Sequence, residues 1–292
     1  MVRAVTETVR TAAGRAAARL GHALGLGAVP PQDDPDAAAA VSQDHKLGRR
    51  DALVTAAQDA PSALEIGPFH NPSLKGANVA YFDLQLQPDL IARVAEYGLP
   101  TDRVPFIDFA DPKGDLSGID RRFAAVFSSH CIEHQPSLVR HLRQVSALLE
   151  PGGRYYLIAP DKRFCFDHYL PLSTLGGVIE AHLEDRRIHS LANLIDARTL
   201  VTHNQKLRHW TADHGDYPTA GHVQYTARHA IAEYQAANGA YIDIHAWRFT
   251  PGRFCEIITA LHQLDFTDLA PELVCATRPG QLEFTAVLRK PG

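Results

Sequence analysis

The sequence predicts an α/β fold: a doubly wound, mostly parallel seven-stranded sheet with an α-rich insertion between its fifth and sixth strands. Three observations predict it. Short apolar runs alternate with helical stretches from residue 62 to 160, as in a parallel sheet joined by crossover helices. The alternation stops from 161 to 250. It then resumes with a helical pattern at 250–264 and a final strand near 281–288.

The five strands before the insertion are short runs of apolar residues. We expect them at 63–66, 79–82, 104–107, 123–127 and 154–158. Between the fourth and fifth runs, leucine and valine recur at helical spacing from Leu138 to Leu149, and Pro151-Gly152-Gly153 ends that helix. The chain therefore has β-α-β order with turn residues where the order requires them.

Composition divides the chain into four segments. We expect an N-terminal helix and linker at 1–40, a Rossmann-like core at 41–160, a histidine-rich insertion at 161–250, and a helix and strands that complete the sheet at 251–292. The insertion holds nine of the 16 histidines, which suggests a lid over a substrate.

Charge and cysteine content narrow the class of protein. The net charge of −4 comes from 29 basic and 33 acidic residues mixed along the chain, which argues against a nucleic-acid partner and leaves a small molecule. The four cysteines are widely separated and read as reduced thiols. No apolar run is long enough for a transmembrane segment, so we expect a cytoplasmic protein. A homo-oligomer remains open.

The turn after the first strand predicts a ligand other than a dinucleotide. Open parallel sheets bind ligands beyond the carboxyl ends of their strands. There, Glu65 closes the strand and Gly67 permits a tight turn, followed by Pro68. Phe69 and Asn71 stand where a dinucleotide fingerprint needs its further glycines. A pyrophosphate would be poorly held at this turn.

Acidic residues follow the next two strands. Asp83 comes directly after the second strand, where a carboxylate can accept hydrogen bonds from both hydroxyls of a ribose. Asp108 is expected after the third strand, where it can accept from an adenine amino group while Phe109 packs on the ring. The two acids in this order favour an adenosine-containing ligand.

The segment after the fourth strand carries a family resemblance. It reads Ser128-Ser129-His130-Cys131-Ile132-Glu133-His134, and the next helix ends in Leu148-Leu149-Glu150-Pro151-Gly152-Gly153. With the "E-x-G" turn and the acid after the second strand, these motifs resemble the small-molecule (type 11-like) branch of the class I S-adenosylmethionine-dependent methyltransferases. The resemblance covers residues 62–160 and, loosely, the last forty residues.

The resemblance implies S-adenosylmethionine as the cofactor. It implies that the cofactor contacts come from the turns at the strand ends: Glu65, Gly67, Pro68, Asp83, Asp108, Phe109, Ser129 and His130. Glu133 and His134 would lie between the cofactor and the acceptor.

Histidines near this edge are candidate general bases. The sulfonium methyl is already electrophilic, so the protein mainly aligns the acceptor and removes its proton. His134 is the first candidate base and His245 the second, with Asp161 as a further catalytic candidate. Aromatic and charged side chains nearby suit a hydroxylated acceptor, with Glu133, Arg163, Phe166, His168 and Trp247 as candidate contacts.

A divalent metal is an open but disfavoured alternative. Asp213, Asp216 and His222 offer hard ligands within the insertion, but their spacing matches no strong metal motif. The favoured function is O-methylation of a sugar or other small polar metabolite. The alternatives are N- or C-methylation, methyl esterification of a carboxylate, and non-catalytic binding of the cofactor or a nucleotide.

Overall fold

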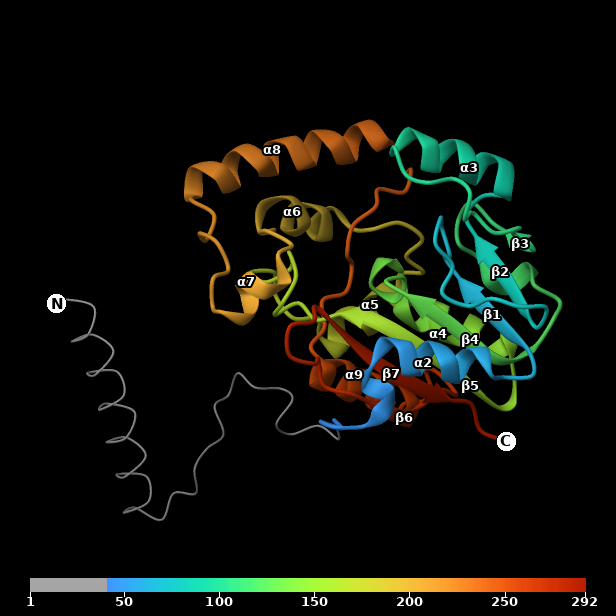
Figure 1. Cartoon of the computed structure of the whole chain (residues 1–292). Helices are drawn as coiled ribbons and strands as arrows, with labels where there is room; N and C mark the ends of the chain where they lie inside the picture. The colour runs from blue at the N-terminus through green and yellow to red at the C-terminus, as the bar shows by residue number, and fades with distance from the viewer. Residues whose placement is uncertain (1–40) are drawn as a thin grey trace, which may run out of the picture.

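A central seven-stranded sheet organises residues 41–292, the part of the chain that this computed structural model describes (Figure 1). Its strand order is β3-β2-β1-β4-β5-β7-β6. The first five strands run parallel, whereas β7 lies antiparallel between β5 and β6. The predicted doubly wound, mostly parallel sheet is confirmed. The proposed helix at 1–40 lies outside the described residues.

The strands alternate with helices in the N-terminal part and at the C-terminus. The strands are β1 (Ala63–Ile66), β2 (Val79–Asp83), β3 (Phe109–Ala110), β4 (Phe123–Ser129), β5 (Leu149–Pro160), β6 (Ala270–Val274) and β7 (Glu283–Arg289). The helices of this part are α2 (Arg50–Gln58), α3 (Gln87–Glu96), α4 (Leu138–Leu148) and α9 (Pro251–Gln263). Short 3-10 helices are η1 (Lys46–Gly48), η2 (Leu116–Gly118) and η3 (Ile132–His134).

Helices fill the insertion between β5 and α9. They are α5 (Leu175–Leu183), α6 (Leu191–Thr199), α7 (Lys206–Trp210) and α8 (Ala220–Ala237). In Figure 1, α6, α7 and α8 lie together beside the sheet. Leu194, Ala197, Ala230 and Ile244 form a small separate apolar cluster there.

Local sequence sets where the longer helices begin. The N-cap side chain accepts a hydrogen bond from a backbone amide of the first turn in α4, α5, α6, α8 and α9. These caps are Ser137, Thr174, Ser190, Thr219 and Thr250. Four of the five caps therefore fix helices that border or form the insertion.

The prediction of a strand at 104–107 is wrong. The third strand is only Phe109–Ala110, and 104–107 is irregular. Pro105 has no amide hydrogen to donate to a neighbouring strand. Apolar residues on either side of it pack against α3 instead of pairing with a strand. Val104 and Ile107 lie in an apolar cluster with Leu90 and Val94 of α3. Burial beneath a helix produced the apolar pattern that resembles a strand.

The main core lies between the sheet and helices α4, α5 and α9. It includes the fully buried side chains of Phe123, Tyr155, Phe249, Phe254 and Phe284. A smaller cluster on α2 contains Leu53, Ala57 and Phe127. The two clusters hold β1, β4 and β5 rigid, so that their carboxyl ends present loops in fixed positions. None of the described helices is long and apolar enough to cross a membrane.

Candidate active site

Three parallel strands end in register at one edge of the sheet. Ile66 is aligned with Phe82 on one side and with Ser128 on the other. The next residues along the chain, Gly67, Asp83 and Ser129, therefore lie at the same edge. Gly67 has a φ of 71°, and a Cβ built on it would meet nothing within 4 Å. Open space of this kind above a glycine turn suits the close approach of a ligand.

Asp83 orients the turn that follows Gly67. Its two oxygens accept hydrogen bonds from the amide of Phe69 at 3.1 Å and from that of Leu84 at 2.7 Å. Phe69 has a φ of 48°, which is unusual for a residue other than glycine. Burial raises the pKa of the Asp83 carboxyl. Each carboxylate oxygen has a second lone pair, so Asp83 can still accept a hydrogen bond from a ribose hydroxyl.

Glu65 is occupied within the protein. Its buried carboxylate accepts hydrogen bonds from the amides of Ser73 and Leu74, both at 2.8 Å. These bonds close the loop that begins at Gly67 and Pro68. Glu65 therefore shapes the turn, and its contact with a cofactor stays a prediction.

Asp108 lies before the third strand instead of after it, because that strand starts at Phe109. The exposed Asp108 carboxylate accepts a hydrogen bond from the amide of Tyr81 at 2.8 Å. Phe109 pairs with Phe82 and is half-buried against the main core. Both residues remain on the side of the sheet next to Asp83, and their contact with adenine stays a prediction.

Ser129 and His130 link the end of β4 to the last strand. Arg50 donates to Ser129 Oγ at 2.8 Å and to Glu283 at 3.1 Å. His130, with a φ of 52°, places Nε2 2.7 Å from Glu283 Oε2. A polar chain of contacts therefore runs from α2 across the end of β4 to β7.

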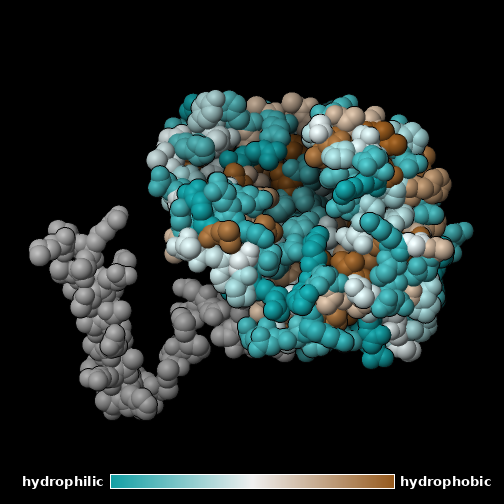
Figure 2. Space-filling view, viewed as in Figure 1, coloured by the Kyte–Doolittle hydropathy of each residue, from teal (hydrophilic) through white to brown (hydrophobic). Residues whose placement is uncertain are grey.

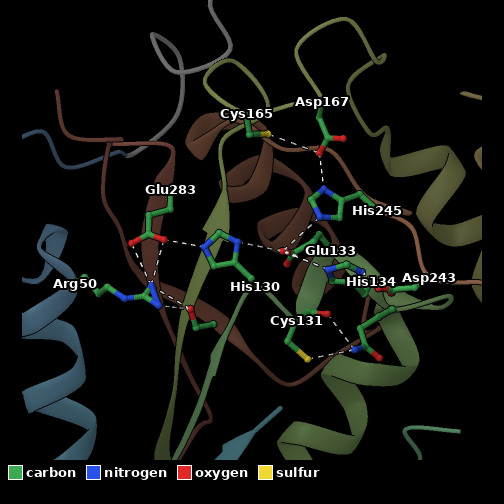
Figure 3. A network of polar contacts seen from close by, with 12 residues as sticks. Arg50, His130, Cys131, Glu133, His134, Cys165, Asp167, Asp243, His245 and Glu283 are labelled. Atoms are coloured by element: carbon green, nitrogen blue, oxygen red, sulfur yellow. Dashed lines mark hydrogen bonds and ion pairs between the residues drawn. The ribbon is translucent and has the colours of Figure 1, made fainter. Parts of the chain in front are cut away.

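Glu133 is the centre of a larger cluster, shown in Figure 3. Its side chain on η3 is fully buried, and neither carboxylate oxygen has a hydrogen-bond partner within the described residues. Three imidazoles surround Oε1: His130 Nδ1 at 3.5 Å, His134 Nε2 at 3.9 Å and His245 Nε2 at 4.0 Å. A buried carboxylate normally requires such nearby positive charge.

Two further carboxylates hold the outer nitrogens of these rings. Asp243 Oδ1 lies 2.9 Å from His134 Nδ1, and Asp167 Oδ2 lies 2.5 Å from His245 Nδ1. These contacts hold Nδ1 of each ring, and Nε2 of each ring is directed toward Glu133. An imidazole oriented by a carboxylate in this way can act as a general base or as a metal ligand.

The charges in the cluster shift its pKa values in opposite directions. Burial alone would lower the pKa of His130, but its carboxylate neighbours Glu133 and Glu283 raise it to about 9. Burial is likewise outweighed at His134, whose pKa is raised by Asp243 and Glu133. Burial would raise the pKa of Glu133, but the surrounding imidazoles lower it. The neighbouring charges therefore favour the protonated form of His130 and His134 and the ionised form of Glu133.

The returning segment at the end of the insertion brings His245 to this cluster. The amides of Ala246 and Trp247 both donate to the carbonyl of Glu133, at 2.8 and 3.1 Å. Trp247 lies in the main core, and its Nε1 donates to the carbonyl of Gln135 at 2.6 Å. Trp247 thus packs in the core, and its contact with an acceptor stays a prediction.

Asp161 also has a structural role. It is fully buried, and its oxygens accept from Arg163 at 2.7 Å and from Thr277 Oγ1 at 2.6 Å. This carboxylate is held inside the protein and is absent from the lining of the cavity beside His245, so its catalytic role stays a prediction. Arg163 serves the same ion pair.

A cavity of about 320 Å³ opens beside the cluster. Figure 2 shows this face of the molecule hollowed between the insertion and the sheet. The cavity is lined by Arg50, His130, Pro160, Cys165, Phe166, Asn204, Lys206, His245, Gln281, Leu282 and Glu283. The Phe166 ring packs 4.7 Å from that of His245, centroid to centroid. The predicted residues Phe166 and His245 therefore share one wall, whereas His168 belongs to a separate histidine cluster.

Sequence reasoning missed several members of the site. Asp167, Asp243 and Glu283 have no sequence motif, and each reaches the cluster only through folding. His189 is also buried close by, with neither ring nitrogen hydrogen-bonded within the described residues, and its ring lies 5.0 Å from that of Tyr241. Burial lowers the pKa of His189 to about 4. Its only sequence signal was the excess of histidine in the insertion.

Two groups of side chains among residues 41–292 have the spacing needed to hold a metal ion. One is Glu133, His134 and His245; the other is His168, His209 and His214. The metal candidates expected from sequence, Asp213, Asp216 and His222, belong to neither group. Asp213 is instead paired with Arg208 at 2.7 Å.

Solved structures show similarity only at the level of the fold. The comparisons include the CcbJ methyltransferase from Streptomyces caelestis, with 20% identity, 39% of this chain and 52% of that chain covered, and a TM-score of 0.28. They also include human N-acetylserotonin methyltransferase, with 13% identity, 83% of this chain and 52% of that chain covered, and a TM-score of 0.36. A third is the N-methyltransferase NodS from Bradyrhizobium japonicum WM9, with 12% identity, 82% of this chain and 91% of that chain covered, and a TM-score of 0.34. The chain spans about half the length of the first two.

The family assignment comes from a sequence model. A comparison with curated proteins finds no match. The model described as "Methyltransferase domain" matches residues 49–243, which is more than half of the chain. That range includes the five parallel strands β1 to β5, the turns at their carboxyl ends and most of the insertion, whereas β6 and β7 lie beyond it. The chain therefore belongs to the methyltransferase domain family, in the class I S-adenosylmethionine-dependent branch that its sheet order and strand-end acids indicate.

Proposed function

We propose that this protein transfers a methyl group from S-adenosylmethionine to a hydroxyl of a small polar acceptor such as a sugar, with His245 as the general base. The Asp167–His245 pair on the wall of the cavity is the observation that carries this proposal. We further propose that 161–250 is the lid that supplies one side of the acceptor site.

The proposed cofactor residues lie at the edge formed by β1, β2 and β4. Gly67 leaves room for close approach, and Asp83 offers carboxylate lone pairs beside it. Ser129 and His130 close the same edge on the other side. When bound there, S-adenosylmethionine supplies an electrophilic methyl group, whose carbon bonds to the acceptor oxygen as its bond to sulfur breaks.

His245 is a better candidate base than His134. Its ring lines the cavity, whereas His134 is absent from the lining. The raised pKa of His134 also favours a proton already in place at neutral pH. Asp167 fixes His245 with Nδ1 as donor, so Nε2 carries the lone pair that can take the hydroxyl proton, and the Asp167 carboxylate stabilises the resulting imidazolium.

The lining of the cavity favours a hydroxylated acceptor. Arg50, Asn204, Lys206, Gln281 and Glu283 supply hydrogen-bond donors and acceptors, while Phe166 supplies an aromatic face. A sugar combines hydroxyl groups with apolar ring faces and matches that mixture. The buried, unbonded imidazole of His189 is a further candidate for acceptor recognition.

Methyl transfer from labelled S-adenosylmethionine to a panel of sugars, sugar nucleotides and phenols tests this proposal. For an acceptor found in the screen, we expect His245→Ala to lower kcat by about 10²- to 10⁴-fold, the usual contribution of a general base. Affinity for S-adenosylhomocysteine should stay within about twofold, because His245 lies outside the proposed cofactor edge.

His229→Ala is the matched control, because His229 is an exposed histidine of α8 and should leave kcat unchanged. A loss of less than about fivefold in His245→Ala would contradict a histidine base and favour N- or C-methylation or esterification, for which alignment of the acceptor suffices. A protein that binds the cofactor but methylates no acceptor class would favour the non-catalytic alternative.

A further inference from the structure

The stretch from 200 to 219, which includes α7, folds without an apolar core of its own. Its only buried residue is a histidine, His209, which is 2% exposed. It contains no cysteine. Small domains that bury little apolar surface usually need a cross-link or a metal ion to hold one conformation, and this stretch buries similarly little.

Other imidazoles surround His209 in place of apolar side chains. His214 Nδ1 lies 3.0 Å from His209 Nδ1. The ring of His168 lies 5.5 Å from that of His209 and is stacked on that of His214 at 3.6 Å, centroid to centroid. The three rings come from the loop after β5, from α7 and from the loop after α7, so their contact joins three segments.

Backbone carbonyls fix the protonation of two of these rings. His209 Nε2 donates to the carbonyl of His203 at 2.9 Å, so its Nδ1 carries a lone pair. His168 Nδ1 donates to the carbonyl of Arg163 at 3.0 Å, so its Nε2 carries a lone pair. Metal-binding histidines are typically held in this way by a hydrogen bond from the ring nitrogen that does not bind the metal.

The loop that carries His214 is held in place from several sides. Thr202 Oγ1 donates to the carbonyl of His214 at 2.5 Å, and Tyr169 Oη donates to that of Gly215 at 2.6 Å. His203 Nε2 donates to the carbonyl of Asp213 at 3.0 Å. These contacts hold the backbone on both sides of His214 and leave its partly exposed ring free to turn toward a shared ligand.

We propose that His168, His209 and His214 together bind a divalent transition-metal ion of the zinc type. One nitrogen from each ring lies within 4.8 Å of the other two. A tetrahedral zinc with bonds of about 2.0–2.1 Å needs its ligand atoms roughly 3.3 Å apart and lies in the plane of each ring. The His214 ring, now nearly parallel to that of His168, therefore has to turn out of this stack to complete the geometry. The ion replaces the proton that His209 Nδ1 and His214 Nδ1 now share.

The chemistry of this cluster differs from that around Glu133. There, carboxylates already pair with the imidazoles, Asp243 with His134 and Asp167 with His245. Here, among residues 41–292, no ion pair joins a carboxylate to any of the three rings, and their hydrogen bonds go to backbone carbonyls and to one another. Neutral imidazoles are the form that zinc, nickel and copper bind.

The site would connect the lid to the proposed base. His168 directly follows Asp167, whose carboxylate holds His245. A metal ion at this position ties α7 and its following loop to the segment that carries Asp167. The ion is therefore structural and takes no part in methyl transfer.

Metal binding by the untagged full-length protein tests this inference. After removal of metal with a chelator, we expect the protein to take up one equivalent of Zn²⁺, and Co²⁺ to give the visible absorption of a tetrahedral site. His214→Ala and His168→Ala should each weaken Zn²⁺ binding by at least about 100-fold, since even residues behind the ligands change affinity 10- to 100-fold. Zinc should also protect 200–219 from limited proteolysis.

His222→Ala is the matched control, because His222 is an exposed histidine of the same insertion and should bind Zn²⁺ as the unaltered chain does. His214 is chosen over the buried His209 so that the variant stays folded, which circular dichroism checks. The proposal is overturned if the unaltered protein takes up no Zn²⁺. It is equally overturned if His245→Ala loses the ion while His214→Ala keeps it, since the ion then lies at Glu133.

Discussion

The charge state of a histidine in this protein depends on its neighbours. His130 and His134 lie among carboxylates and have raised pKa values. His141 is fully buried next to Tyr155, whose hydroxyl lies 3.1 Å from His141 Nε2, and burial and the charge of Arg140 lower its pKa to about 4. The same side chain thus serves as an ion-pair partner in the site and as a neutral packing group beneath it.

The neutral state of His141 makes stability depend on pH. Its pKa in the folded protein is below that of the unfolded chain, so the unfolded chain binds more protons between pH 6.5 and 4. Stability is therefore full above about pH 6.5 and is lost as the pH falls. At pH 5, His141 should lower the free energy of unfolding by about 2 kcal/mol relative to its value above pH 6.5.

Urea unfolding of the protein and of His141→Gln at pH 7.5 and pH 5 measures this cost. We expect the variant, whose amide can still bond to Tyr155, to lose about 2 kcal/mol less than the unaltered chain between the two pH values. The comparison of the two chains removes the contribution of all other titrating groups. Equal losses in both would show that His141 does not stay neutral on folding.

At the scale of elements, the sequence predicted those parts that depend on local pattern. Four of the five strands predicted before the insertion, the helix α4 and the final helix α9 were found near their predicted bounds because each has its own apolar period. The strand at 104–107 failed because packing under α3 imitates that period. The two-residue β3 is too short to leave a pattern.

The site was predictable only where it follows strand ends. Gly67, Asp83 and His130 come directly after strands, and parallel register brings them to one edge. Asp167 and Asp243 belong to the insertion. Asp167 is 78 residues from its partner His245 along the chain, and Asp243 is 109 residues from its partner His134. No local pattern encodes such pairs, because the packing of the returning segment on Glu133 creates them.

The end of β5 is held by a buried ion pair, which gives a test of element stability. The Asp161 side chain is fully buried, whereas that of Arg163 is 34% exposed, so removal of Asp161 leaves an arginine that water can still reach. We therefore expect Asp161→Ala to lower the free energy of unfolding by about 2–3 kcal/mol, mainly through the lost hydrogen bonds to Arg163 and Thr277. Chemical denaturation followed by circular dichroism measures the change.

An exposed ion pair of the insertion supplies the control. Arg198 and Glu233 join α6 to α8 at 2.8 Å, and both side chains are more than a third exposed. Glu233→Ala should cost less than about 1 kcal/mol. A similar small loss in Asp161→Ala would mean that Asp161 does not hold the sheet edge and would favour its assignment as a site residue.

At the scale of the whole molecule, the sheet and the insertion have separate tasks. The sheet fixes the turns that are proposed to hold the cofactor, and the insertion brings Phe166, Asn204 and His245 to the wall of the cavity. Contacts such as the stacked rings of Phe164 and Trp210, 4.0 Å apart, join the start of the insertion to α7. Cofactor binding and acceptor chemistry should therefore be separable by substitution.

Titration calorimetry with S-adenosylhomocysteine tests the central claim most directly. We expect micromolar binding by the unaltered protein, no binding of NAD, and a loss of at least about tenfold in affinity in Asp83→Ala, because one charge-assisted ribose contact contributes roughly 1.5–3 kcal/mol. His245→Ala should bind as the unaltered protein does. Absence of S-adenosylhomocysteine binding in the folded, unaltered protein would contradict the account and leave only the fold.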